Sequence, residues 1–95
     1  MMKNLLIFTL NGCSYCRELK DKLTNLSIPF KDVEITKNRK LWEHVLSQTG
    51  DDALPTVFIQ NDNEDSGLVY TPGKNFQDVN EIIEIIMKQH TEKGS

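Results

Sequence analysis

The order of hydrophobic and polar positions in the first third of the chain predicts a strand, a helix and a second strand. An apolar run over residues 4–10 is followed directly by Asn11-Gly12, as expected of a buried strand that ends in a turn. Apolar residues then recur at spacings of three and four, which predicts a helix from about residue 14 to residue 25. After Pro29, apolar residues among charged ones predict a strand over residues 30–35. Such a unit implies parallel strands joined by a right-handed crossover.

The rest of the chain predicts a helix, a hairpin and a final helix. A stripe of apolar residues predicts a helix over residues 38–49, and the glycine after it suits a helix C-cap. Residues 57–59 and 68–70 read as two strands of a hairpin joined by a polar stretch. Asn75 is the predicted N-cap of the last helix, with Asp78 three residues on. The clearest apolar stripe of the chain follows in that helix.

These elements together predict an α/β fold with a four-stranded mixed sheet, in the order βαβ, then α, then ββα, flanked by three helices. We expect residues 1–92 to form this single domain. Residues 93–95 are predicted to be a C-terminal tail outside this domain, of the kind that an expression vector adds.

Charge and composition narrow the possible partners. The 95-residue chain is 38% hydrophobic and has a formal net charge of -3, which gives no general attraction for nucleic acid or an anionic membrane. The apolar run near the N-terminus is too short for a signal peptide, and no stretch approaches membrane-spanning length. We therefore expect a cytoplasmic monomer that binds neither nucleic acid nor membrane.

The two cysteines carry the candidate chemistry. Cys13 and Cys16 are separated by two residues and stand where the first strand ends and the first helix begins. Unpaired backbone N–H groups and the positive end of the helix dipole stabilise a thiolate at that place, so Cys13 is the predicted nucleophile. Cys16 lies three residues later, within the apolar stripe of the helix, and is the predicted resolving thiol.

Two other uses of the cysteine pair fit this sequence less well. A structural disulfide of a secreted protein would normally close a longer loop. A zinc site needs four ligands, usually from a second close pair of residues, and this sequence has no second cysteine pair. His44 and His90 stand alone on predicted helices and are interpreted as ordinary helix residues, so no protein metal site is predicted.

Two motifs make a family resemblance specific. The sequence Cys13-Ser14-Tyr15-Cys16 follows a strand ending Phe8-Thr9, and Leu-Pro-Thr-Val-Phe-Ile follows at residues 54–59. In these features the chain resembles the glutaredoxins of the thioredoxin-like superfamily over nearly its whole length. The resemblance implies a thioredoxin-like fold and a glutathione-dependent thiol–disulfide oxidoreductase that reduces glutathione mixed disulfides and protein disulfides. It also implies a role in electron transport and cell redox homeostasis.

The resemblance also implies which residues bind glutathione. In the family, a cis proline opposite the active site follows a residue whose backbone pairs with the cysteinyl part of glutathione. An aromatic residue between the cysteines flanks the tripeptide, and backbone N–H groups at the start of the last helix hold its glutamyl carboxylate. The corresponding residues here are Tyr15, Leu54, Pro55, Asn75, Phe76 and Gln77.

Three departures from the family pattern bear on activity. Leu10 stands where many members have a lysine that stabilises the thiolate. Ser14 replaces the commoner proline. Members with this replacement include some that hold a [2Fe-2S] cluster between two protomers and two glutathiones, which implies Cys13 as the ligand from this chain. Asp51 and Asp52 precede the proline motif and are expected to weaken binding of anionic glutathione.

Three functions therefore stay open. The first is a glutaredoxin that uses glutathione as reductant and acts on glutathionylated or other disulfide-containing proteins, ribonucleotide reductase among the candidates. The second is a [2Fe-2S] cluster carrier. The third is a thioredoxin-like donor reduced by a reductase, although thioredoxins usually have Trp before the first cysteine and Gly-Pro between the pair, and this chain has neither.

Overall fold

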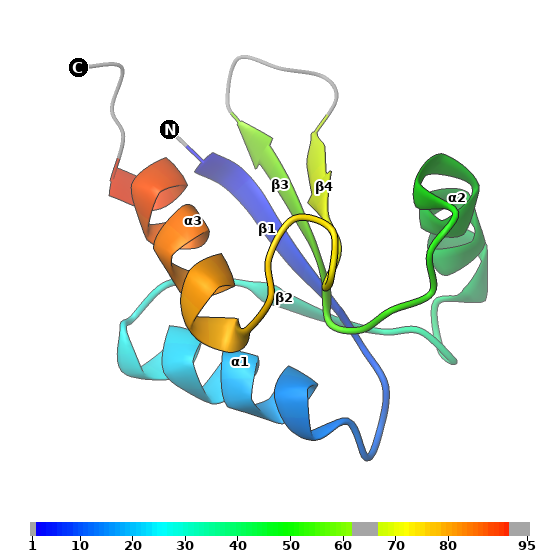
Figure 1. Ribbon diagram of the computed structural model, residues 1–95, viewed down its shortest axis with the longest axis horizontal. Coiled ribbons are helices and arrows are strands. Elements are labelled where there is room, and N and C mark those ends of the chain that lie inside the picture. Colours follow the sequence, from blue (N-terminus) through cyan, green and yellow to red (C-terminus); the bar gives the residue numbers. More distant parts are fainter. Residues whose placement is uncertain (1, 62–66, 92–95) are drawn as a thin grey trace.

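The computed structural model describes residues 2–61 and 67–91, and its order of elements is the predicted one (Figure 1). The predicted tail, residues 93–95, lies outside the described residues. No helix among those described is long and apolar enough to cross a membrane. The elements are β1 (Met2–Thr9), α1 (Ser14–Asn25), β2 (Lys31–Glu34), α2 (Arg39–Thr49), β3 (Thr56–Asn61), β4 (Leu68–Tyr70) and α3 (Val79–Thr91).

The four strands form one mixed sheet in the order β2-β1-β3-β4. β1 and β2 are parallel, as the crossover through α1 requires, whereas β1 with β3 and β3 with β4 are antiparallel. β1 begins two residues before the predicted strand and ends at Thr9, one residue before its predicted end. β3 extends beyond the predicted residues 57–59 because its pairing with β1 continues to Met2 opposite Asn61. The predicted α/β fold, a four-stranded mixed sheet with three helices, is confirmed.

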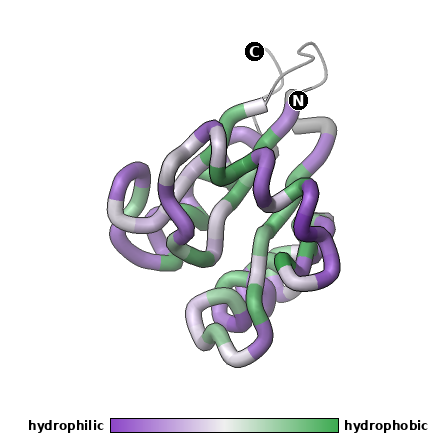
Figure 2. Tube along the Cα trace, turned by 90° about the vertical axis from the view of Figure 1, so that its right-hand side faces the viewer, coloured by the Kyte–Doolittle hydropathy of each residue, from purple (hydrophilic) through white to green (hydrophobic). Residues whose placement is uncertain are grey.

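The sheet separates two unequal hydrophobic layers. Successive side chains of a strand point to opposite faces, so Leu5 and Ile7 of β1 pack with α1 and α3, whereas Phe8 packs with α2. Figure 1 shows α2 apart from the other two helices, and Figure 2 shows apolar residues gathered along the strands. The larger layer buries Leu5, Ile7, Leu19, Leu23, Ile28, Val57, Ile59, Phe76, Val79, Ile82, Ile83 and Ile86, and the smaller one buries Phe8, Val33, Trp42 and Val45.

The helix ends follow from local chemistry. α1 has the predicted bounds. α2 ends at Thr49, and its C-cap Gly50 has a φ of 68°, the left-handed conformation that a glycine adopts readily. The predicted N-cap of the last helix, however, is wrong by three residues. The carboxylate of Asp78 accepts a hydrogen bond from the backbone N–H of Glu81 at 2.9 Å, and α3 begins at Val79.

Asn75 instead stabilises the loop before α3. Its Oδ1 accepts a hydrogen bond from the backbone N–H of Thr71 at 2.9 Å. The backbone N–H of Gly73, where φ is 86°, donates to the carbonyl of Phe76 at 2.7 Å. Because burial of the Phe76 side chain holds this segment in a loop, the helix starts only after it.

Candidate active site

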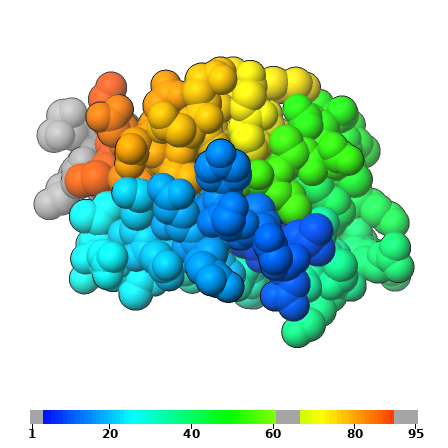
Figure 3. All heavy atoms as spheres, turned by 60° about the horizontal axis from the view of Figure 1, so that its bottom comes forward, coloured from blue at the N-terminus to red at the C-terminus, as the bar shows by residue number. Residues whose placement is uncertain are grey.

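The Cys-x-x-Cys motif lies at the end of the sheet where β1 passes into α1. Phe8 of β1 pairs with Thr56 of antiparallel β3, so the Leu54-Pro55 turn that precedes β3 lies at the same end. Figure 3 turns this end toward the viewer and shows the blue β1–α1 segment in the middle of the face, with green and yellow segments beside it. Topology thus brings the two predicted motifs to one edge of the molecule.

Cys13 is the N-cap residue of α1. The β1–α1 turn is closed by a hydrogen bond from the Cys13 N–H to the Leu10 carbonyl at 3.1 Å, and Gly12 supplies a φ of 89° that few other residues adopt. The Cys13 side chain is partly exposed, and its Sγ accepts a hydrogen bond from the Cys16 N–H at 3.2 Å. An accessible sulfur at a helix N-terminus is the predicted placement of the nucleophile.

Cys16 has the opposite environment. Its side chain is 1% exposed, and both cysteines are free thiols. Burial raises the pKa of the Cys16 thiol to about 12, and a hydrogen bond with Cys13 adds to the increase. A backbone hydrogen bond with Leu10 and the charge of Lys20 act in the lowering direction. Cys16 is therefore shielded from solvent and reacts only after losing a strongly held proton.

The other predicted glutathione residues on this edge have the expected placement. The Leu54–Pro55 peptide bond is cis, as predicted, and Pro55 is buried while Leu54 is partly buried against the α2 layer. The Thr56 hydroxyl donates to the Ala53 carbonyl at 2.7 Å and ties the turn together. Tyr15 is 62% exposed beside the cysteines. Contact of these residues with glutathione stays a prediction.

The predicted anion site before α3 is largely occupied by the chain itself. The backbone N–H of Gln77 donates to the Glu81 carboxylate at 2.6 Å, and the N–H of Asn75 donates to the Thr71 carbonyl at 3.0 Å. Phe76 contributes its side chain to the core. Two of the three predicted N–H donors are thus already bonded within the chain.

The two acidic residues before the proline motif differ in their surroundings. Asp51 accepts a hydrogen bond from the Ala53 N–H at 2.9 Å, and its other oxygen lies 3.9 Å from the Lys74 ammonium. Asp52 is exposed. The charge of Asp51 is therefore partly compensated. The predicted repulsion between this loop and anionic glutathione would come mainly from Asp52.

Sequence reasoning missed a polar network on the α1 side of the sheet. The Thr9 hydroxyl donates to one Asp32 oxygen at 2.6 Å, and the Lys20 ammonium lies 2.9 Å from the other. Partial burial alone would raise the pKa of Asp32, but the bonds from Thr9 and Lys20 outweigh it and lower that pKa. The available signal was the spacing of Lys20 four residues after Cys16, which places both on one helix face.

This network borders a polar cavity of about 300 Å³ beside the cysteines. Within the described part of the chain, its cationic lining residues are Arg17 and Lys20. The complete lining is Leu10, Asn11, Gly12, Cys13, Ser14, Cys16, Arg17 and Lys20. A positive charge and the buried thiol thus share one water-accessible space.

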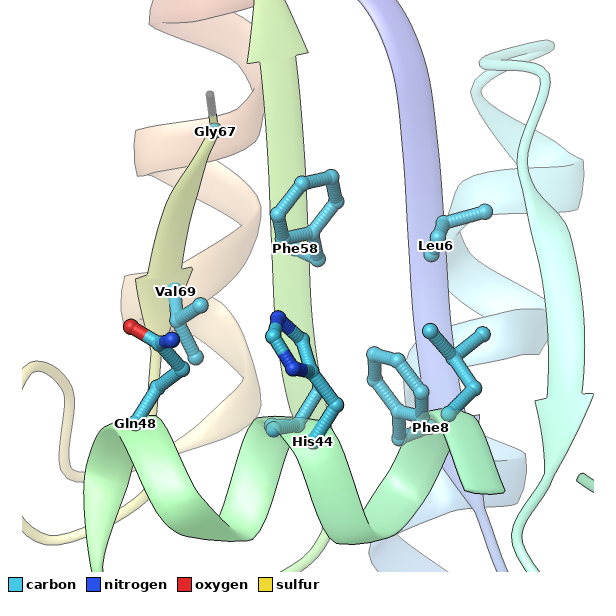
Figure 4. Close-up of a pocket in the computed structure, with 9 residues that line it drawn as sticks. Leu6, Phe8, His44, Gln48, Phe58, Gly67 and Val69 are labelled. Carbon is cyan, nitrogen blue, oxygen red and sulfur yellow. The ribbon is translucent and has the colours of Figure 1, made fainter. Parts of the chain in front are cut away.

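A second cavity, of about 370 Å³, lies between α2 and the sheet and contains no cysteine. Figure 4 shows His44 and Gln48 of α2 across from Phe58 and Val69 of the strands. His44 is exposed at the rim of this hollow, and the side chain of His90 lies outside the described residues. The cavity is lined mainly by apolar groups, and no residue of the Cys-x-x-Cys motif lines it.

The cluster-binding alternative requires ligands from outside this chain. A [2Fe-2S] cluster is held by four cysteine or histidine ligands, and of the two cysteines only Cys13 reaches the surface. Over residues 2–61 and 67–91, no group of three or more His, Cys, Asp or Glu side chains could hold a metal ion. The donor set of a single chain therefore does not fit such a cluster.

Comparison with known proteins adds independent information. The model of the Glutaredoxin family matches residues 5–63. N-acetyl-S-hydroxy-L-cysteine reductase of Bacillus subtilis (strain 168) is 29% identical over 65 residues, which are 68% of this chain and 70% of the relative. Glutaredoxin 3 of Escherichia coli (strain K12) is 29% identical over 58 residues, 61% of this chain and 70% of the relative.

A solved structure shares the fold. The glutaredoxin-like protein NrdH-redoxin from Escherichia coli superposes with a TM-score of 0.61 at 22% sequence identity. The superposition covers 84% of this chain and 95% of that one.

Proposed function

Because the chain belongs to the glutaredoxin family, we propose that it reduces disulfides through a dithiol cycle in which Cys13 attacks and Cys16 resolves. The observation that carries this proposal is the contrast between the two sulfurs. Cys13 is partly exposed at the N-terminus of α1, whereas Cys16 is 1% exposed one helical turn behind it. Only the first can meet a bulky disulfide, and only the second is protected from reacting with it.

The cycle balances as two thiol–disulfide exchanges. The Cys13 thiolate attacks one sulfur of the substrate, the S–S bond breaks, and the leaving thiolate takes a proton from water. Cys16 then loses its proton and attacks the Cys13 sulfur, which releases the second substrate thiol. The substrate has gained two electrons and two protons, and the protein holds a Cys13–Cys16 disulfide.

Electron supply to that disulfide has two candidates. Glutathione is the reductant that the sequence resemblance favours. The bonded N–H groups of Asn75 and Gln77, together with the exposed Asp52, oppose strong binding of its glutamyl carboxylate. We therefore propose that a protein reductase, acting directly on the disulfide, is the more effective donor, and that glutathione is a weak one.

Sulfenic acids are a second candidate substrate. An S-hydroxy-cysteine is a sulfenic acid, and the Bacillus subtilis relative is named for the reduction of its N-acetyl form. Attack of the Cys13 thiolate on such a sulfur would expel hydroxide, which takes a proton to become water. The mixed disulfide that remains is the same intermediate that Cys16 resolves in the first proposal.

The roles of the two cysteines are tested with single variants on two substrates. Cys13→Ser should abolish reduction of both a glutathionylated peptide and a protein disulfide. Cys16→Ser should retain reduction of the glutathionylated peptide, because external thiol can complete that reaction, and lose reduction of the protein disulfide. Equal loss in both variants on both substrates would refute the division of roles.

The electron donor is tested in the same system. Steady turnover of the wild-type protein is compared with glutathione plus glutathione reductase and with NADPH plus a thioredoxin reductase. Faster turnover with the protein reductase supports the proposed donor. Faster turnover at physiological glutathione would restore glutathione as the main reductant.

A further inference from the structure

The resolving step requires a buried thiol, that of Cys16, to lose its proton. Cys16 must become a thiolate before it can attack Cys13, yet its side chain is buried, and burial raises the pKa of its thiol. Little of this thiolate is present near neutral pH, so any group that stabilises it raises the rate of resolution. The family lysine that precedes the nucleophile is absent, since Leu10 stands there.

Lys20 has the position of such a group. It lies four residues after Cys16 on α1, and both line the polar cavity beside the motif. Its ammonium is held at 2.9 Å from Asp32 of β2, and Asp32 is itself fixed by the buried Thr9 hydroxyl of β1. The ion pair holds the cation on the side of α1 that faces β2, although 30% of the Lys20 side chain is exposed.

We propose that Lys20 stabilises the Cys16 thiolate across this cavity and so accelerates the resolving exchange. The proposal rests on the dithiol function proposed above. The proton of Cys16 leaves to water in the cavity, and the electron pair of the sulfur forms the new bond to Cys13. Lys20 itself stays protonated throughout.

The other titratable groups around Cys16 do not replace Lys20. Cys13 is blocked as the mixed disulfide when resolution takes place. Arg17 also lines the cavity but is exposed, and among the described residues no ion pair holds its side chain as Asp32 holds that of Lys20. Asp32 is an anion and would oppose thiolate formation were it not paired with Lys20.

The two exchanges can be timed separately with dipyridyl disulfide, a neutral aromatic reagent whose released thiopyridone absorbs light. Attack by Cys13 releases one thiopyridone and leaves a Cys13–pyridyl mixed disulfide. Attack by Cys16 on that bond releases the second thiopyridone and forms the Cys13–Cys16 disulfide. Because the reagent is uncharged, loss of a lysine does not change its attraction to the protein.

Lys20→Met should leave the first phase unchanged and slow the second by about threefold for each unit by which the Cys16 pKa rises, because the smaller thiolate fraction outweighs its higher nucleophilicity. Lys20→Arg should restore the second phase. Arg17→Gln removes an equal charge from the same cavity and should leave both phases unchanged. In wild type and Lys20→Met alike, the second phase should rise about tenfold per pH unit between pH 6 and 9.

Asp32→Asn distinguishes an electrostatic effect of the Lys20 charge on Cys16 from a structural effect, in which the Lys20–Asp32 ion pair only holds α1 against β2. This variant breaks the ion pair, as Lys20→Met does, but keeps the Lys20 cation and an acceptor for the Thr9 hydroxyl. An electrostatic role predicts a second phase that is no slower than in wild type, whereas a structural role predicts equal slowing in both variants. Equal slowing, or an unchanged second phase in Lys20→Met, would overturn the proposal for Lys20.

The dithiol function fails in a different way. If Cys16 is not the resolving thiol, each chain releases a single thiopyridone in every variant, and there is no second phase to compare. Cys16→Ser provides that one-phase reference.

Discussion

Asp32 offers a direct measure of how much the network beside the active site contributes to stability. Its carboxylate accepts the hydroxyl proton of Thr9, which is 2% exposed, at 2.6 Å, and pairs with Lys20 at 2.9 Å. Three variants separate these interactions: Asp32→Asn, Asp32→Ala, and Asp32→Ala combined with Thr9→Val. Asparagine keeps an acceptor for Thr9, alanine removes it, and valine removes the donor that would be left without a partner.

The expected losses differ because only one of the two partners is buried. Side-chain exposures of 30% and 44% make the Lys20–Asp32 pair a surface ion pair, worth about 0.2–1 kcal/mol after solvent screening. Asp32→Asn should cost about that much. Asp32→Ala should cost a further 1–3 kcal/mol, roughly, because the buried Thr9 hydroxyl loses its acceptor. Adding Thr9→Val to Asp32→Ala should recover most of this second loss.

Urea unfolding at several pH values provides the measurement. The pKa of Asp32 is lowered in the folded state from its ordinary 3.8, so ionisation of this group contributes stability at pH values above 3.8. That contribution is lost as pH falls through the lower folded-state pKa. The difference between wild type and Asp32→Asn should therefore be complete at pH 7 and shrink below about pH 4.

Two results would contradict this reasoning. If Asp32→Ala is no more destabilising than Asp32→Asn, the Thr9 hydroxyl does not depend on the carboxylate. If the difference between wild type and Asp32→Asn is the same at pH 3 as at pH 7, it does not come from the charge of Asp32.

Two further predictions concern the α3 cap and the acidic pair. Asp78→Ala should lower the free energy of unfolding by about 0.5–2 kcal/mol, because the Glu81 N–H loses its capping acceptor; a urea titration that matches wild type would show that the cap contributes nothing. Asp52→Asn should lower the apparent Michaelis constant for a glutathionylated substrate up to about fivefold at low salt and less at high salt. Asp51→Asn should change that constant less, since Asp51 is bonded to Ala53 and lies near Lys74. Equal effects of both variants in the steady-state assay would show that Lys74 does not compensate the charge of Asp51.

Short-range patterns were sufficient for most of the fold. The bounds of α1 could be predicted because an Asn-Gly turn, a cysteine cap and three apolar spacings all agree on them. The separation of Cys13 from Cys16 by burial also follows from the helical period, since Cys16 falls in the stripe with Leu19. The cis bond before Pro55 was accessible only through the family motif.

Longer-range features could not be derived in this way. Asn75 and Asp78 are both good N-cap residues, and the choice between them depends on burial of Phe76 in a core that the local sequence does not specify. The Thr9–Asp32 bond depends on the parallel register of β1 and β2, which no turn fixes. The hydrogen bond from the Gln77 N–H to Glu81 could not be predicted either, because it depends on α3 beginning at Val79.

The unequal division of the core by the sheet has a consequence for motion. α2 is held by a layer of four buried residues above a hollow, whereas α1 and α3 share a layer of twelve. Local opening takes the route that exposes least apolar surface, so the amide hydrogens of α2 should exchange with solvent at a lower free-energy cost than those of α3. Because α2 leads through Gly50 into the Leu54–Pro55 turn, such local opening would displace this turn next to the cysteines. α1, the helix of the Cys-x-x-Cys motif, would stay folded.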